Sequence, residues 1–178
     1  IRRNIELLLQ EEEIEPGRFI TNFQLGQSYF FLGEMERAIE RMEIAAYGEN
    51  NYRRTPFWYV SAYVQLGWMY KIAGREQDAL RTLQEALSRD PANPVAKLVV
   101  GEIKCYGGEC KEALEILSSI SDEDFRPTVF ALSIDKMRYH LHFLRGRCHE
   151  QLGDCQQAAA EYATALALDP GCISAKKQ

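Results

Sequence analysis

One spacing of small residues occurs four times in this chain, and it limits the possible folds more than any other feature. The clearest copy places Gly67, Gly74 and Ala79 at intervals of seven and five residues. The same intervals recur at Gly26, Gly33 and Ala38, at Gly101, Gly108 and Ala113, and at Gly146, Gly153 and Ala158. Such repetition is typical of repeat architectures, in which each unit packs mainly against its neighbours. The sequence therefore predicts a stack of similar units.

The clearest copy has the pattern of two helices joined by a turn. Apolar residues at helical spacing predict a first helix over about residues 57–73, with Pro56 at its first position. Gly74 can adopt the left-handed conformation that ends a helix, and a second apolar period then predicts a second helix that ends before Pro91. Replacing Gly67 on the packed face by a residue with a larger side chain would destabilise the fold by about 1–3 kcal/mol through overpacking. We therefore expect the two helices to cross at Gly67.

This unit resembles the tetratricopeptide repeat, a helix–turn–helix motif of 34 residues. Its consensus positions are occupied here by Tyr63, Leu66, Gly67, Tyr70, Gly74, Ala79, Leu83, Ala86 and Pro91. The resemblance implies an all-α fold, a right-handed superhelical solenoid of antiparallel helix pairs. We expect a single solenoid over residues 1–178, comprising a helix of a preceding partial repeat at 1–15, four repeats at 19–52, 60–93, 94–127 and 139–172, and an insertion at 128–138.

The four copies are unevenly spaced along the chain. Their first glycines are separated by 41, 34 and 45 residues, so seven extra residues precede the second copy and eleven precede the fourth. We expect the first excess to form a longer loop at residues 49–54. The second excess lies within SDEDFRPTVFALSID (residues 121–135) and forms either a loop that packs back or a forward extension of the next helix.

The composition excludes several classes of function. The net charge of −5 argues against a phosphate-binding surface, and no apolar run approaches the roughly 20 residues that span a bilayer. Five cysteines without the rhythm of a disulfide scaffold indicate free thiols and a cytoplasmic location; Cys105 and Cys110 do not form a CxxC pair. Because the chain begins at Ile1, within the repeat pattern, we interpret it as a piece of a longer protein.

Two histidines are the strongest candidates for metal ligands. His142 and His149 share a helical face and could be joined by Cys148 or Cys155. Both histidines occupy packing positions of the fourth repeat, however, and no paired ligand spacing supports a metal site. We therefore predict no metal, no cofactor and no catalytic residue, and we expect that this chain itself is not an enzyme.

The resemblance implies a binding groove, because the first helices of tetratricopeptide repeats line a concave surface. By the repeat frame, the groove is aromatic in its N-terminal half and charged in its C-terminal half. Exposed aromatic patches are typical of interfaces, so we expect a protein-interaction scaffold that binds a peptide, helix or partner domain, not nucleic acid or a membrane. Alternatively, an upstream part of the chain covers the groove. The predicted binding residues are Phe23, Gln27, Phe30, Phe31, Val64, Trp68, Lys71, Glu102, Phe143 and Arg147.

Three further interpretations concern the partner and the parent protein. The Lys, Asn and Arg clamp of chaperone-binding relatives is absent, because the corresponding positions carry Phe23, Gln27, Val64, Leu98 and Glu102. The segment RRNIELLLQEEEIEPGRFITNFQLGQSYFFLGEMERAIE (residues 2–40) resembles the region that follows the catalytic domain of bacterial family 2 glycosyltransferases. That resemblance implies a non-catalytic accessory domain. A self-associating structural module, and hence a homo-oligomer, is the remaining alternative.

Overall fold

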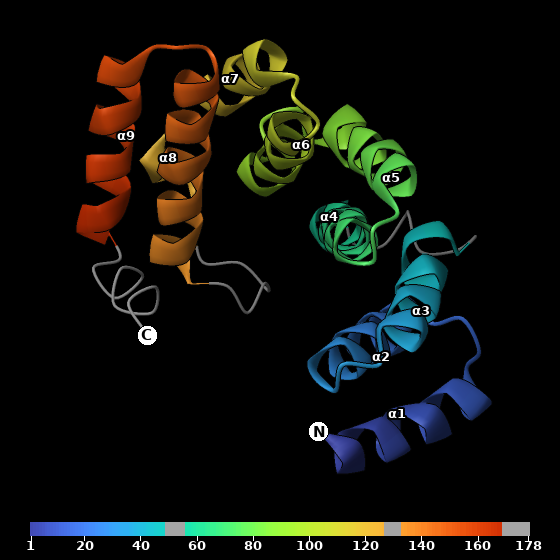
Figure 1. Ribbon diagram of the computed structural model, residues 1–178. Helices are drawn as coiled ribbons and strands as arrows, with labels where there is room; N and C mark the ends of the chain where they lie inside the picture. Colours follow the sequence, from blue (N-terminus) through green and yellow to red (C-terminus); the bar gives the residue numbers. More distant parts are fainter. Residues whose placement is uncertain (49–55, 127–132, 169–178) are drawn as a thin grey trace. The chain divides into compact units, whose positions relative to one another are not determined.

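The computed structural model describes residues 1–48, 56–126 and 133–168, and all regular secondary structure within these ranges is helical (Figure 1). The elements are α1 (Arg2–Ile14), α2 (Phe19–Phe31), α3 (Met35–Tyr47), α4 (Pro56–Ile72), α5 (Glu76–Arg89), α6 (Pro94–Tyr106), α7 (Cys110–Ser118), the short 3-10 helix η1 (Asp122–Asp124), α8 (Ile134–Gln151) and α9 (Cys155–Leu168). The all-α fold predicted from the sequence is confirmed.

Successive helices pack as antiparallel pairs: α2 with α3, α4 with α5, α6 with α7, and α8 with α9 (Figure 1). The turn of the second pair contains Gly74, whose φ of 75° lies in the left-handed region that other residues rarely adopt. The backbone N–H of Arg75 then donates to the carbonyl of Tyr70 at 2.8 Å, which closes the end of α4. The turns of the other three pairs carry Gly33, Gly108 and Gly153 in the same conformation.

Each pair crosses where its first helix carries a glycine. A Cβ atom added to Gly67 would lie 2.6 Å from Cγ of Leu83 on α5, which is closer than real Cβ contacts. The corresponding glycines of the other pairs face Met42, Leu117 and Tyr162 in the same way. The expected crossing at the small residue is therefore present.

The start of α6 is fixed by a side-chain cap followed by proline. The Asn93 side chain accepts a hydrogen bond from the Ala96 N–H at 3.0 Å, and Pro94 occupies the first position of α6. Helix α4 begins at Pro56 and ends at Ile72, close to the predicted range of 57–73. The expected loop at 49–54 lies outside the described residues.

The chain forms two compact units, Ile1–Pro91 and Ala92–Gln178. In the first unit, α1 packs against α2 through Ile5 and Leu8. Both units have an aliphatic interior, whose fully buried side chains include Leu25, Met42, Leu66 and Leu83 in the first and Leu117, Leu141 and Leu144 in the second.

The insertion of the second unit combines the two structures left open by the sequence. Residues 121–126 leave α7, form η1 and bury Phe125 in the unit, as a loop that packs back. Helix α8 then begins at Ile134, five residues before the expected start of the repeat at 139, as a forward extension. Residues 127–132 lie outside the described part of the chain.

Candidate partner-binding surface

Aromatic side chains form a partly exposed cluster on α2 and α4 of the first unit. The cluster consists of Phe30, Phe31 and Trp68. The centroid of the Phe30 ring lies 6.0 Å from that of Phe31 and 5.0 Å from that of Trp68. Phe31 is 56% exposed, whereas Phe30 and Trp68 are half-buried. The structure thus brings together three of the predicted aromatic groove residues, all of which retain some access to solvent.

Two glutamines join the same helices beside this cluster. Nε2 of Gln27 donates to Oε1 of Gln65 at 3.1 Å. Gln65 is buried, and its own Nε2 has no hydrogen-bond partner among the described residues. A buried donor without an acceptor is energetically unfavourable. Lys71, one turn after Trp68 on α4, is half-buried.

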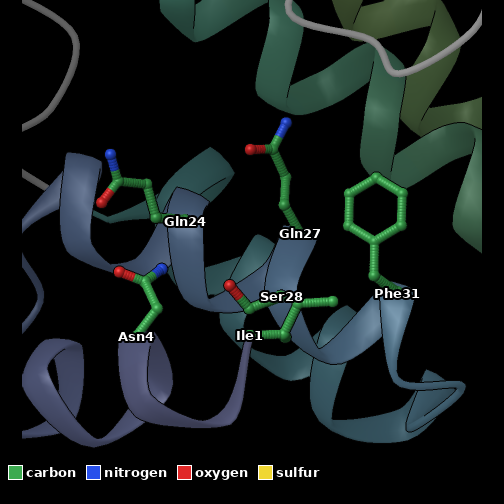
Figure 2. Close-up of a pocket in the computed structure, with 6 residues that line it drawn as sticks. All are labelled: Ile1, Asn4, Gln24, Gln27, Ser28 and Phe31. Atoms are coloured by element: carbon green, nitrogen blue, oxygen red, sulfur yellow. The ribbon is translucent and has the colours of Figure 1, made fainter.

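A pocket of about 430 Å³ adjoins the cluster between the start of α1 and α2 (Figure 2). Its lining is a mixture of amide, hydroxyl and apolar groups, and Gln27 and Phe31 belong both to this lining and to the predicted groove. The other lining residues are Ile1, Asn4, Gln24 and Ser28. The partly exposed surface therefore extends beyond the residues identified by the repeat frame, because α1 supplies one wall.

Three of the predicted groove residues are buried and do not contribute to the exposed surface. Phe23 packs between Phe19 and Trp58, at centroid distances of 5.5 and 6.1 Å. Val64 is also in the interior, and buried Glu102 lies 3.2 Å from Nε2 of His140. Phe23 is covered because α4 begins before the repeat frame and thereby places Trp58 against it.

The remaining predicted residues, Phe143 and Arg147, lie on α8 of the second unit. The Arg147 guanidinium stacks over the Tyr106 ring at 4.3 Å. Phe143 contacts the Tyr162 ring at 5.8 Å. Burial, together with a hydrogen bond to Glu150, raises the pKa of Tyr162 to about 12. Both predicted side chains are half-buried within aromatic contacts, so this surface is less accessible than that of Phe31.

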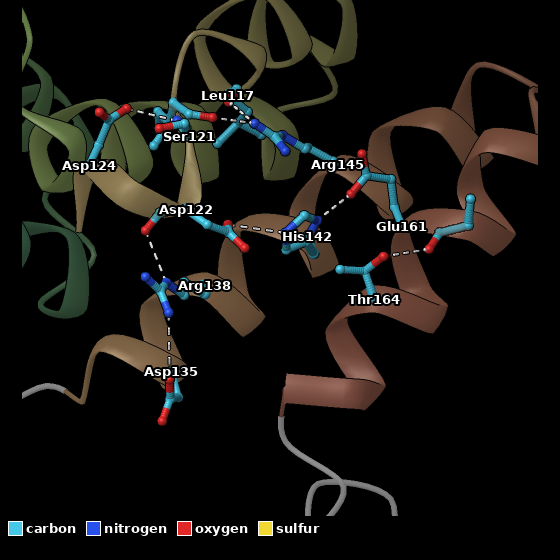
Figure 3. Close-up of polar contacts among 12 residues, drawn as sticks. Leu117, Ser121, Asp122, Asp124, Asp135, Arg138, His142, Arg145, Glu161 and Thr164 are labelled. Carbon is cyan, nitrogen blue, oxygen red and sulfur yellow. Dashed lines mark hydrogen bonds and ion pairs between the residues drawn. The ribbon is translucent and has the colours of Figure 1, made fainter.

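His142 connects the insertion to the last two helices (Figure 3). Its Nδ1 lies 2.6 Å from Glu161 on α9, and its Nε2 lies 3.2 Å from Asp122 in η1. His149 instead lies 3.7 Å from Asp154. The two histidines thus have separate carboxylate partners and do not assemble with a cysteine into the metal site considered from the sequence.

Two arginines of α8 hold the end of α7 and the start of η1 through backbone carbonyls (Figure 3). Nη2 of Arg145 donates to the carbonyls of Leu117 and Ile120 at 2.8 and 2.6 Å. Nε of Arg138 donates to the carbonyl of Asp122 at 2.9 Å. These bonds satisfy acceptors at and beyond the end of α7, where a helix leaves its last carbonyls unpaired.

Three cysteines meet in the interior of the second unit. The sulfur atoms of Cys105, Cys110 and Cys148 lie within 4.8 Å of one another, and all three side chains are buried. Burial raises the pKa of Cys105 and of Cys148, which keeps these groups as thiols at neutral pH and makes them poor nucleophiles. Sequence reasoning missed this cluster because Cys148 belongs to the following repeat.

Models of the tetratricopeptide repeat match residues 21–43, 72–133 and 139–172, which together exceed half of the chain. The chain belongs to the tetratricopeptide repeat family. Proteins of this family are generally non-catalytic scaffolds for protein interactions. No curated protein matches the chain.

Solved structures of tetratricopeptide proteins share the fold at low sequence identity. A crystal structure of MamA is 18% identical, with a TM-score of 0.68, covering 96% of this chain and 89% of its own. YrrB, described as a TPR protein with an unusual peptide-binding site, is 16% identical, with a TM-score of 0.67, covering 99% and 84%. The C-terminal part of a TPR repeat-containing protein from Cytophaga hutchinsonii is 16% identical, with a TM-score of 0.66, covering 93% and 58%.

The helices of this tetratricopeptide chain are short or polar by membrane standards. Among residues 1–48, 56–126 and 133–168, no helix combines the length and the hydropathy needed to cross a bilayer.

Proposed function

We propose that this chain is a protein-interaction scaffold that binds a peptide or helix on the α2–α4 surface, defined by Gln27, Phe30, Phe31, Trp68 and Lys71. The observation that carries the proposal is the aromatic cluster in which the largely exposed Phe31 adjoins Phe30, itself packed on Trp68. Clustered aromatic side chains that are already fixed by mutual contact are the usual anchors of interfaces, because little conformational freedom remains to be lost.

The polar groups beside the cluster suit a peptide backbone. The amide group of half-buried Gln27, which donates to Gln65, lies beside the cluster where a strand or loop would run. Lys71 adds a positive charge on the same helix as Trp68. We therefore expect a ligand with an apolar anchor residue. The tetratricopeptide family and the peptide-binding site in the description of YrrB support this class of ligand.

A peptide selection tests this proposal. Peptides selected from a random display library against the 178-residue chain are titrated with the wild type and with Phe31→Ser. We expect Phe31→Ser to weaken binding at least about tenfold, since aromatic anchors commonly contribute more than 1.4 kcal/mol. Leu152→Ser removes an exposed apolar side chain from the other unit and is the matched control. Peptides that bind both variants like the wild type would contradict the proposed surface.

Self-association is a second candidate, favoured by the outer face of α1. Leu7 and Ile14 are two turns apart on this helix, and their side chains are 53% and 85% exposed. Sedimentation velocity over a range of concentrations tests it. A dimer that dissociates in Leu7→Ser/Ile14→Ser supports this candidate, whereas a monomer at every concentration removes it.

The accessory-domain interpretation rests on the resemblance of residues 2–40 to glycosyltransferase sequences. It stays a prediction, as does the cytoplasmic location. The sequence encoded upstream of Ile1 in the parent gene tests the accessory-domain interpretation. If that interpretation is right, a catalytic domain of glycosyltransferase family 2 must be encoded there.

A further inference from the structure

The buried cysteines of the second unit come from three different helices. Cys105 lies near the end of α6, Cys110 begins α7, and Cys148 lies on α8. Their sulfur atoms are mutually within 4.8 Å. Buried cysteines often serve as small packing residues, but three sulfur atoms converging at one point also form a preassembled set of soft ligands.

The separations fit a single metal ion at the centre of the three sulfur atoms. A metal–sulfur bond of about 2.3 Å in a trigonal plane places neighbouring sulfur atoms about 4.0 Å apart. The sulfur–sulfur separations in the structure are at most 4.8 Å and therefore exceed this value by less than about 1 Å. Binding therefore requires the sulfur atoms to move together by less than about 1 Å.

The ligand set selects among the soft metals. Structural zinc requires four ligands, normally cysteine or histidine, and the histidines of α8 are already directed to carboxylates: His142 to Asp122 and Glu161, and His140 to Glu102. The neighbouring group is the Gln151 amide, whose Oε1 accepts from Sγ of Cys110 at 2.7 Å. An amide oxygen is a poor zinc ligand compared with thiolate or imidazole. A three-coordinate site composed of sulfur alone instead favours monovalent copper.

We propose that Cys105, Cys110 and Cys148 form a binding site for one Cu(I) ion. The ion is bound by sulfur from α6, α7 and α8 and therefore joins both helices of the third repeat to the first helix of the fourth. Binding replaces thiol protons, which pass to solvent, and involves no change in oxidation state.

The surroundings of the cluster disfavour a redox switch and require a metal that can displace tightly held thiol protons. Cu(I) bound to thiolates carries net negative charge, and the Arg147 guanidinium acts favourably on Cys105 as a thiolate. A redox sensor requires exposed thiols of low pKa, whereas these are buried and the pKa values of Cys105 and Cys148 are raised. A metal with very high affinity for sulfur can displace these protons where a weaker one cannot.

A competition titration tests the site. The chain is prepared as Cys155→Ser/Cys172→Ser, which leaves only the three clustered cysteines of the five in the sequence. Cu(I) is titrated without oxygen against a chromophoric Cu(I) chelator, and Zn²⁺ is titrated in parallel. We expect one Cu(I) per chain, with zinc bound more weakly. Cys148→Ala in this background is expected to lower the Cu(I) affinity at least about a hundredfold.

Two measurements keep the result decisive if an alanine variant fails to fold. Circular dichroism reports the helicity of each variant, and X-ray absorption at the copper edge counts the ligands in the parent background. Three sulfur neighbours near 2.3 Å support the site. Fewer sulfur neighbours, zinc bound in preference to copper, no copper bound by the parent background, or equal copper affinity in a folded Cys148→Ala variant would each overturn it.

Discussion

Gly67 and Leu83 show, at the scale of single residues, how one missing side chain determines the distance between two helices. Leu83 is fully buried and occupies the space that a Cβ on residue 67 would need. At the equivalent contact of the first repeat, a Cβ added to Gly26 would instead lie 3.0 Å from the terminal Cε of Met42, and 3.2 and 3.3 Å from the backbone O of Ala38 and N of Met42. The two crossings therefore differ in how easily the opposing side chain can move.

Gly67→Ala is expected to lower the free energy of unfolding by about 1–3 kcal/mol, because branched Leu83 cannot withdraw without disturbing the core. Gly26→Ala is the matched comparison and should cost less, because flexible Met42 can withdraw its Cε; the backbone atoms of Ala38 and Met42 at 3.2 and 3.3 Å keep some cost at this position. Urea unfolding followed by circular dichroism measures both. Equal losses at the two positions would show that the opposing side chain does not determine the cost.

The pKa of Tyr63 predicts a loss of stability at high pH. Burial and the nearby Tyr59 raise this pKa to about 12, compared with about 10 in an unfolded chain. The folded state then holds the proton more tightly, so its contribution is complete below pH 10 and is lost as the pH rises towards 12. The melting temperature should fall less over this range in Tyr63→Phe than in the wild type. Tyr106→Phe, at an exposed tyrosine, is the control.

Sequence reasoning identified residues whose role is fixed within one repeat and missed those that depend on neighbouring repeats. The crossing at Gly67 and the turn at Gly74 follow from local spacing, and both are confirmed. The burial of Phe23 depends on Trp58 from the next helix pair. The cysteine cluster likewise depends on α8 approaching α6 and α7, and no local spacing encodes such an approach.

At the scale of elements, α8 holds the end of α7 through Arg145. Arg145→Met is expected to lower the free energy of unfolding by about 1–3 kcal/mol, because the carbonyls of Leu117 and Ile120 lose a charged donor. Arg81→Met is the control, since Arg81 is 75% exposed in its ion pair with Asp78 and should contribute less than about 1 kcal/mol. Thermal unfolding measures both, and equal shifts would contradict the role of Arg145.

The insertion shows why an element boundary was left open by the sequence. Its acidic start and apolar continuation fit a loop and a helix equally well, and the structure contains both around the undescribed residues 127–132. Tertiary contacts determine where the loop lies: Phe125 is buried, and Asp122 is bound by Arg138 and His142. Such contacts join residues from different elements, so periodicity alone cannot reveal them.

At the scale of the whole molecule, the division into Ile1–Pro91 and Ala92–Gln178 predicts unfolding in more than one step. Both tryptophans, Trp58 and Trp68, belong to the first unit, so their fluorescence reports on that unit alone. Gly101→Ala overpacks against Leu117 in the second unit. We expect it to shift unfolding detected by circular dichroism more than unfolding detected by fluorescence. Coincident shifts would show that the chain unfolds as one cooperative array.

The crossing glycines also determine where this chain can change in length. Each faces the residue sixteen positions later: Gly26 with Met42, Gly67 with Leu83, Gly101 with Leu117, and Gly146 with Tyr162. One residue gained or lost within such an interval would rotate the second helix by about 100° and turn the opposing side chain away. Both natural length excesses instead fall between helix pairs, before α4 and before α8. Foreign segments such as epitopes or linkers should therefore be tolerated at these two joints and excluded from the hairpins.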